Sequence, residues 1–217
     1  ELKKLMWGDH IVCQSEGTYK KVRKLISSSQ SCSLITPWRP DDIIQFDKGR
    51  RIETRKKLFV GYKHIVIFPG EFDRLGVDVK FRECIKSFFE NSKDSLVVFA
   101  CRFDKKGTGQ IIASEFPHQV KSLGSTDNII PLLEASDLVI YPVRTMDHKF
   151  QPPLVILEAL QLKSKVLISD AIEIKQDLSS LIEYEKVDDW AVYGKTMAKI
   201  LASKKNTTLH VNHYSFN

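Results

Sequence analysis

The sequence predicts an α/β fold with a doubly wound parallel sheet. Four short segments are apolar at almost every position, and stretches of helical or loop character separate them. Strands of this kind are typical of parallel sheets whose two faces are both covered by helices. The pattern is clearest in residues 127–170, where the hydrophobic period changes from helix to strand, back to helix and again to strand.

The N-terminal segments form a smaller group. Residues 10–13 are typical of a short strand, and Ser15 is typical of a cap for a helix that runs to about Ile26. The serine-rich segment 27–40 contains two prolines, which predicts a linker or a crossing between domains. The charged segment 41–57 is expected to be a loop or a short helix.

The larger group of elements begins at residue 64. Residues 64–68 and 95–100 are predicted strands, and between them lie a glycine-bounded loop at 69–76 and an amphipathic helix at 77–91. That helix is expected to bury its apolar side chains, which are Val79, Cys84, Ile85, Phe88 and Phe89. The later elements are predicted at 110–116 and 119–123 (strands), 127–135 (helix), 137–142 (strand), 154–160 (helix), 165–169 (strand) and 189–202 (helix).

The order of these elements also predicts where a ligand binds. In parallel α/β sheets, ligands bind beyond the carboxyl ends of the strands. The loops after Phe68, Ala100, Leu123 and Tyr141 should therefore meet around one crevice. These loops also hold the polar residues that the strands lack.

The net charge of +6 is concentrated in residues 1–60, and segment 48–57 (KGRRIETRKK) is the densest basic cluster. One interpretation is a solvated loop. The other is contact with an anionic membrane surface, where each basic residue adds roughly 1 kcal/mol, or with an acidic acceptor. No nucleic-acid partner is expected, because the cluster lacks interleaved aromatic residues and the rest of the chain has no further basic stripe.

Several classes of protein are disfavoured by the sequence. The four cysteines form no CxxC pair, which predicts free thiols in a reducing, cytoplasmic compartment. The histidines show no metal-ligand spacing, no segment resembles a signal peptide, and no apolar run approaches a membrane span. No glycine-rich dinucleotide or Walker-type loop supports dehydrogenase or NTPase chemistry. The chain opens without Met, which predicts a piece of a longer protein.

One carboxylate stands out in the 154–160 helix. Glu158 is surrounded by Leu157, Ala159 and Leu160, and an unpaired buried carboxylate would cost several kcal/mol. The order of a helix, ASDLVIYP, a variable loop, PLVILEAL and VLIS resembles the donor-nucleotide half of GT-B glycosyltransferases of the large retaining family 4, also called group 1. Glu158 matches the family glutamate that holds the ribose hydroxyls of the nucleotide sugar.

The resemblance implies a Rossmann-like donor domain and a division of the chain. Residues 1–40 would be the tail of the acceptor-side domain and a linker, and 41–217 the donor-nucleotide-binding domain. The implied activity is transfer of a hexose from a nucleoside-diphosphate sugar with retention. It also implies that no metal and no further cofactor are needed, because basic side chains and backbone amides neutralise the diphosphate.

The family loop that clamps the diphosphate reads roughly G-R-x-x-x-K-G. Here the matching loop begins at Gly70 and is one residue shorter, with Glu71 in the Arg position and Leu75 in the Lys position. Arg74 is the remaining cation in that loop; one interpretation is an exposed turn residue, and the other is the ligand of the diphosphate. Further candidates follow the next strand, at Arg102 and Lys105–Lys106.

Two other segments complete the implied donor site. Phe150 lies eight positions before Glu158, where the family has a glutamate that contacts the transferred sugar, and Asp147 is a possible substitute. Lys149 and Gln151 belong to the same loop, Lys149 as a further candidate cation. Pro152 and Pro153 remove amides from the helix start. Leu123 and Gly124 resemble the family segment whose main chain faces the nucleobase.

The sequence assigns no catalytic residue and leaves alternatives open. A catalytically degenerate glycosyltransferase-like domain, which binds a nucleotide or a partner, fits the substitutions at Glu71, Leu75 and Phe150. An unrelated doubly wound protein is the other alternative. The donor base, the sugar and the acceptor are not specified by any motif.

Overall fold

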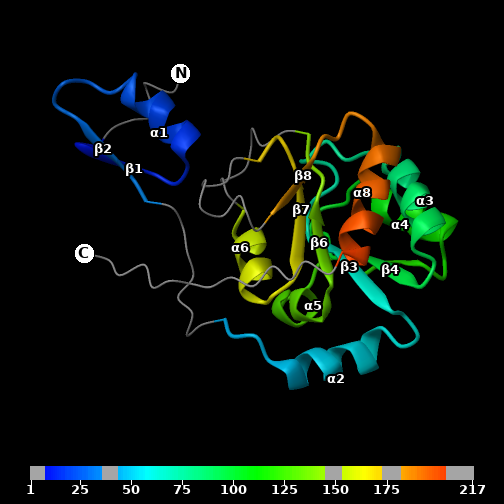
Figure 1. The fold of residues 1–217 in the computed structure, drawn as a ribbon. Helices are drawn as coiled ribbons and strands as arrows, with labels where there is room; N and C mark the ends of the chain where they lie inside the picture. The colour runs from blue at the N-terminus through cyan, green and yellow to red at the C-terminus, as the bar shows by residue number, and fades with distance from the viewer. Residues whose placement is uncertain (1–7, 36–43, 145–152, 173–181, 204–217) are drawn as a thin grey trace.

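The computed structural model describes residues 8–35, 44–144, 153–172 and 182–203. They form two parallel sheets (Figure 1). One has two strands, β1 and β2, and the other has six strands in the order β5-β4-β3-β6-β7-β8. The larger sheet grows outward from β3 in both directions along the chain, so the predicted doubly wound α/β fold is confirmed.

The smaller sheet is a single βαβ unit made of β1 (His10–Cys13), α1 (Glu16–Arg23) and β2 (Ser31–Leu34). Ser15 caps the helix as predicted, since its Oγ accepts the amide of Thr18 at 3.2 Å. The prediction of a linker over 27–40 missed β2, which pairs in parallel with β1. This strand is polar and only partly buried, so it carries no apolar run that would indicate a strand.

The larger sheet contains β3 (His64–Phe68), β4 (Ser95–Phe99), β5 (Val120–Ser122), β6 (Leu138–Tyr141), β7 (Lys165–Ser169) and β8 (Glu183–Glu185). Every neighbouring pair is parallel. The strands predicted at 64–68 and 165–169 are confirmed at both ends. The short edge strand β8 was not predicted, because it has no apolar run.

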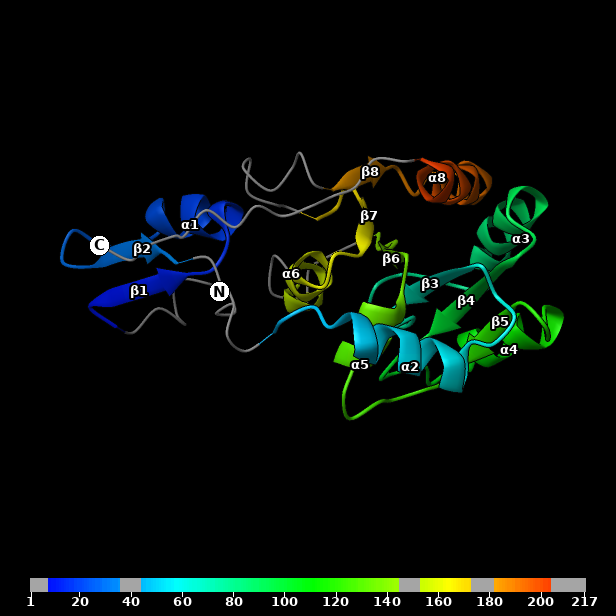
Figure 2. The same cartoon turned by 60° about the horizontal axis from the view of Figure 1, so that its bottom comes forward.

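Alternate residues of each central strand enter different hydrophobic layers. Val66 and Phe68 pack with α3 (Phe81–Asn91) and α8 (Trp190–Ala202). Ile65 and Ile67 pack in the other layer, with Leu132 and Ala135 of α5 (Ile130–Ala135). Figure 2 shows α3 and α8 on one side of the sheet and α5 on the other. Burial on both faces is the physical reason for the continuous apolar runs.

The segment predicted as a strand at 110–116 is instead helix α4 (Thr108–Glu115). The carboxylate of Asp104 accepts the amides of Thr108 at 2.6 Å and Gly109 at 2.7 Å, and so caps the first turn. Only Ile112 of its two adjacent isoleucines is buried. The strand prediction was wrong because so short an apolar run does not distinguish the hydrophobic period of a helix from that of a strand.

Helix α3 begins at Phe81 rather than at residue 77, and Val79 is exposed rather than buried. The other four side chains predicted to point inward, Cys84, Ile85, Phe88 and Phe89, are buried. Helix α6 (Leu154–Gln161) and helix α8 confirm their predictions, and Asp189 caps α8 through the amide of Ala191 at 2.8 Å.

The basic segment forms helix α2 (Lys48–Leu58), so the helix alternative is correct. Its three arginines form ion pairs within the molecule, which a solvated loop would not require. Arg50 forms an ion pair with the fully buried Glu134 of α5, and both Arg51 and Arg55 form ion pairs with Asp137. The lysines of the cluster, in contrast, are exposed, namely Lys48, Lys56 and Lys57.

Candidate functional site

The parallel topology brings the carboxyl ends of β3, β4, β5 and β6 to one edge of the sheet. We call these strand ends and the loops that follow them, 69–80, 100–107, 123–129 and 142–144, the carboxyl edge. Most of the described site candidates lie on it, as the sequence predicted, and Glu158 follows on the next helix. The remaining question is which of them the packing makes available to a ligand.

The base of the carboxyl edge is a buried aromatic cluster. Phe72 from the loop after β3 packs against Phe68 and Phe99, with ring centroids 5.1 Å apart in both pairs. Phe81 and Tyr141 extend the cluster. Because these rings are buried and interlocked, the loop after β3 is held against the strand ends.

Two loop positions show why the backbone takes this path. At Gly70 an added Cβ would lie 2.1 Å from Cε2 of Phe68, so only glycine fits there without displacing a core ring. Leu75 is completely buried, and its carbonyl accepts the amide of Arg144 at 3.0 Å. Leu75 therefore belongs to the core, and a lysine in its place would have no room to reach a phosphate.

Arg74 is present at the carboxyl edge but is already engaged. Its guanidinium lies 3.8 Å from Oε2 of Glu71, and 4.7 Å from the ring centroid of Phe103 in the loop after β4. The Arg74 side chain is 55% exposed, whereas that of Glu71 is 9% exposed. A ligand phosphate at Arg74 would therefore compete with a carboxylate that is already in place.

Glu71 influences two neighbouring strand ends. Burial raises the pKa of the Tyr141 hydroxyl well above its ordinary value, and the Glu71 charge adds to that rise. Burial likewise raises the pKa of the Cys101 thiol, with smaller contributions from nearby groups that include Glu71. Both shifts favour the neutral forms of the two groups.

The loop after β4 uses its own groups to satisfy the start of α4. The amides at the α4 start are occupied by Asp104, so this helix terminus is not open to an external anion. The amide of Lys105 donates to Asp73 at 2.7 Å and ties this loop to the loop after β3. The side chains of Arg102, Lys105 and Lys106 are exposed.

Leu123 and Gly124 follow the edge strand β5. The Leu123 amide donates to the carbonyl of Phe99 at 2.9 Å, so the sheet consumes that donor. Gly124 has a φ of 69°, in the left-handed region that favours glycine at a turn. Of the two, Leu123 offers its carbonyl and a side chain that is 45% exposed.

Glu158 lies in the second turn of α6 and is 5% exposed. The helix begins after Pro153, which makes no side-chain capping bond. The other residues that the sequence placed in this part of the site, Asp147, Lys149, Phe150, Gln151 and Pro152, lie outside the described residues.

The structure adds groups that the sequence reasoning missed. Arg144 follows β6 at the carboxyl edge, is exposed, and stacks 5.3 Å from the ring centroid of Trp190. The sequence could have indicated Arg144 as a candidate, because it lies shortly after the predicted strand at 137–142. Glu134 is a second carboxylate on an apolar helix, the same pattern that drew attention to Glu158, and its partner is Arg50.

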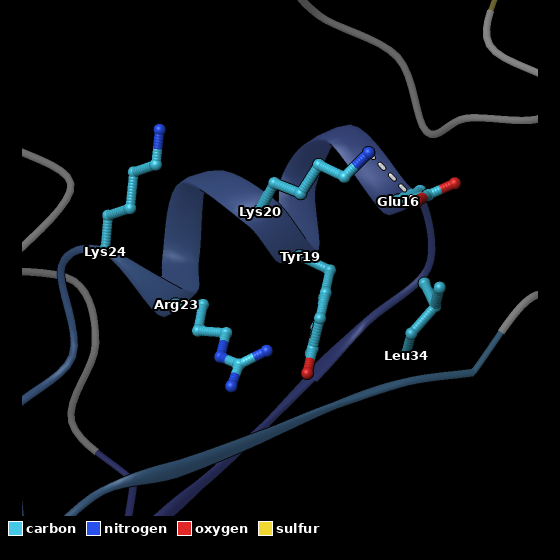
Figure 3. Close-up of a pocket in the computed structure, with 6 residues that line it drawn as sticks. All are labelled: Glu16, Tyr19, Lys20, Arg23, Lys24 and Leu34. Carbon is cyan, nitrogen blue, oxygen red and sulfur yellow. Dashed lines mark ion pairs between the residues drawn. The ribbon is translucent and has the colours of Figure 1, made fainter.

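A pocket of about 560 Å³ lies on the small βαβ unit rather than at the carboxyl edge (Figure 3). It is lined by Glu16, Tyr19, Lys20, Arg23, Lys24 and Leu34. Lys20 is paired with Glu16 at 2.9 Å. The other cations lie at the end of α1, where positive charge compensates the negative end of the helix dipole. A phosphate would be opposed by that dipole, so we do not place the donor there.

No group of three or more His, Cys, Asp or Glu side chains is arranged to hold a metal ion in the described part of the chain. None of the described helices is long and apolar enough to cross a membrane. The four cysteines are free, and Cys13, Cys84 and Cys101 are buried.

No family model and no curated protein matches this sequence. Several solved structures resemble its fold. Sucrose-phosphate synthase from Thermosynechococcus elongatus superposes with a TM-score of 0.71 at 16% identity, over 93% of this chain and 51% of that chain. Alr3699/HepE from Anabaena superposes with a TM-score of 0.64 at 13% identity, over 93% of this chain and 58% of that chain.

A single-domain structure gives the most direct comparison. The C-terminal domain of the group 1 glycosyl transferase LpcC from Francisella tularensis superposes with a TM-score of 0.60 at 14% identity, over 78% of this chain and 91% of that domain. The chain spans only about half the length of the first two proteins. The fold is therefore that of the C-terminal half of GT-B glycosyltransferases, as the order of sequence motifs predicted.

Proposed function

We propose that this chain is the donor-binding part of a glycosyltransferase. It would move a hexose from a nucleoside-diphosphate sugar to an acceptor, with retention at the anomeric carbon. The observation that carries the proposal is the GT-B fold with a buried glutamate, Glu158, on the helix that follows β6. The Anabaena protein of the same fold was crystallised with UDP and glucose, which supports a nucleotide sugar as the ligand class.

Each part of the donor has a proposed contact at the carboxyl edge. Glu158 would accept hydrogen bonds from the ribose hydroxyls, and the Leu123–Gly124 backbone would face the base. Gly70 lies shortly after the end of β3, and its backbone would face the diphosphate. Lys149, Phe150 and Gln151 stay assigned to the sugar and phosphate side of the site.

The chemistry asked of these residues is mainly electrostatic. As the bond to the sugar breaks, negative charge develops on the leaving diphosphate, and fixed cations at that point lower the barrier. The described candidates are Arg74, Arg102 and Arg144. In this proposal they and the backbone amides provide the neutralisation without a metal ion.

The function is tested by calorimetric titration of UDP, GDP and ADP and of the corresponding glucose nucleotides. We expect one base to bind preferentially and its glucose nucleotide to compete for the same site. Binding followed by nucleoside-diphosphate release in the presence of acceptor extract supports transfer. Binding without any release supports the degenerate, nucleotide-binding alternative. The absence of binding by all six nucleotides would contradict the proposal.

We also propose that the outer face of α2 contacts an anionic membrane surface. Lys48, Lys56 and Lys57 are exposed there, and Ile52 is 43% exposed among them. Cations that surround an exposed aliphatic side chain suit the boundary between lipid headgroups and acyl chains.

A further inference from the structure

Glu71 puts a negative charge at the point where the proposed site must receive a diphosphate. It follows Gly70 directly after β3, is 7% exposed, and lies 3.8 Å from the guanidinium of Arg74. Asp73 adds a second carboxylate to the same loop, and its Oδ1 is buried without a hydrogen-bond partner in the described structure. Loop 69–76 therefore carries two acidic side chains and one basic one.

The loop cannot easily move this charge away. Phe72 between the two acidic residues and Leu75 after them are completely buried, and the backbone at Gly70, before them, lies against the ring of Phe68. Asp73 is tied to the loop after β4 through the amide of Lys105. Side chains with fixed anchors on both sides keep their positions when a ligand arrives.

Arg74 is correspondingly constrained. The guanidinium is held between the Glu71 carboxylate and the Phe103 ring, so its charge is already partly compensated. A second anion brought to Arg74 would also be brought close to Glu71, and like charges in a partly buried site repel strongly. This arrangement therefore reduces the binding affinity that each phosphate group of a ligand can add.

We propose that Glu71 is a specificity-determining residue that holds Arg74 and keeps the affinity of the carboxyl edge for a nucleoside diphosphate low. This inference rests on the proposed function, because it assumes that the nucleotide binds at this edge. Weak retention of the diphosphate would favour its release after transfer, a step that often limits turnover.

The test compares a nucleoside, its monophosphate and its diphosphate on the intact chain by calorimetry. In the wild type, we expect the diphosphate to bind less than about threefold more tightly than the monophosphate, because repulsion offsets the added contacts. Glu71→Gln should tighten the diphosphate by roughly tenfold and leave the nucleoside unchanged. The gain should disappear in Glu71→Gln combined with Arg74→Ala, and should shrink at high salt.

Glu115→Gln is the matched control, since Glu115 is also paired with an arginine, Arg82 at 3.4 Å, but lies on α4. This substitution should leave all three affinities unchanged. If the nucleoside binds but the diphosphate gains nothing in Glu71→Gln, the role of Glu71 is refuted and the nucleotide site stands. If no ligand binds to any variant, the proposed function fails as well.

The wild-type comparison decides the matter even if Glu71→Gln does not fold. A wild-type diphosphate affinity more than tenfold above that of the monophosphate would overturn the inference without any substitution.

Discussion

The guanidinium of Arg50 makes two hydrogen bonds to the carboxylate of Glu134, from Nε and, at 2.9 Å, from Nη2. Glu134 is completely buried on α5, and the amide of Asp47 also donates to it. The pair joins the helix that leads into the large sheet to a helix more than 80 residues away in the chain. This contact gives the buried carboxylate its partner and accounts for one arginine of the basic segment 48–57.

Loss of this contact should destabilise the fold. We expect Arg50→Ala to lower the free energy of unfolding by about 2 kcal/mol, less than a fully buried pair because the Arg50 side chain is 40% exposed. Urea denaturation followed by circular dichroism measures the change. Lys48→Ala, on the same helix but exposed, should change stability by less than about 0.5 kcal/mol. Equal effects of the two substitutions would show that Glu134 finds another partner.

Glu158 is the residue whose role is tested most directly. In titrations with the preferred nucleoside diphosphate, Glu158→Gln should weaken binding by roughly 1–3 kcal/mol, the cost of losing hydrogen bonds to a charged acceptor. Glu115→Gln, on the exposed side of α4, serves as the control. Unchanged affinity combined with a lower unfolding free energy would identify Glu158 as a structural residue only.

Arg74 should carry most of the phosphate-dependent affinity that remains. The loop is one residue short, and Glu71 and Leu75 replace two family cations, so we expect nucleoside diphosphate to bind in the high micromolar range or more weakly. Arg74→Ala should remove this binding, whereas Arg82→Ala, a matched exposed arginine on α3, should not. Sub-micromolar binding that is insensitive to Arg74→Ala would transfer the role to Arg102, Lys149 or Arg144.

The α2 surface predicts salt-sensitive lipid binding. Co-sedimentation with phosphatidylserine vesicles should be strong at low salt and fall steeply as salt screens the exposed charges. Lys56→Glu combined with Lys57→Glu should abolish it. Lys86→Glu, which changes an exposed lysine on α3 across the sheet, should have a much smaller effect. Failure to bind the vesicles at low salt would rule out the membrane contact.

His64 predicts a specific dependence of stability on pH. Burial lowers the pKa of His64 below its ordinary 6.5, Lys63, Arg55 and Lys165 act in the same direction, and Asp137 opposes them. The unfolded chain therefore binds a proton at a higher pH than the folded chain. The His64 contribution is fully present above about pH 6.5 and is lost as the pH falls toward the folded pKa.

Urea denaturation between pH 5 and pH 7.5 measures this effect. His64→Gln should flatten the decline relative to wild type, whereas His118→Gln, at an exposed position, should leave it unchanged. An identical pH profile for wild type and His64→Gln would mean that other groups cause the acid sensitivity.

The apolar strands could be predicted from the sequence because nearly every residue in them lies in the same buried, apolar environment. Strands β3 and β7 are buried on both faces, so every position is apolar and their ends are marked by the first polar neighbours. Strands β2 and β8 lie at sheet edges, and neither has an apolar run that would reveal it; the side chains of β2 are only partly buried or exposed. The formation of helix α4 depends on the Asp104 cap and on packing, and neither can be seen in the hydrophobic period of the segment itself.

For the candidate site, too, part could be predicted from the sequence and part depended on packing. The order of apolar strands, helices and motifs was sufficient to predict the fold, and the edge at which a ligand would bind stays a prediction. The substitutions at Glu71 and Leu75 were also visible, but their consequences were not. Only packing shows that Leu75 is a core residue and that Glu71 holds Arg74.

The sequence by itself determined the α/β class, the parallel sheet and the order of its central strands in the chain, because hydrophobic periodicity is a local property. Only the tertiary structure decided which charged side chains form ion pairs within the molecule and which stay available to a ligand. Arg50, Arg51 and Arg55 find their partners about 80 residues away, and Arg74 finds a partner three residues away together with a ring on the next loop. Charge pairing depends on distances in space, which no local pattern in the chain contains.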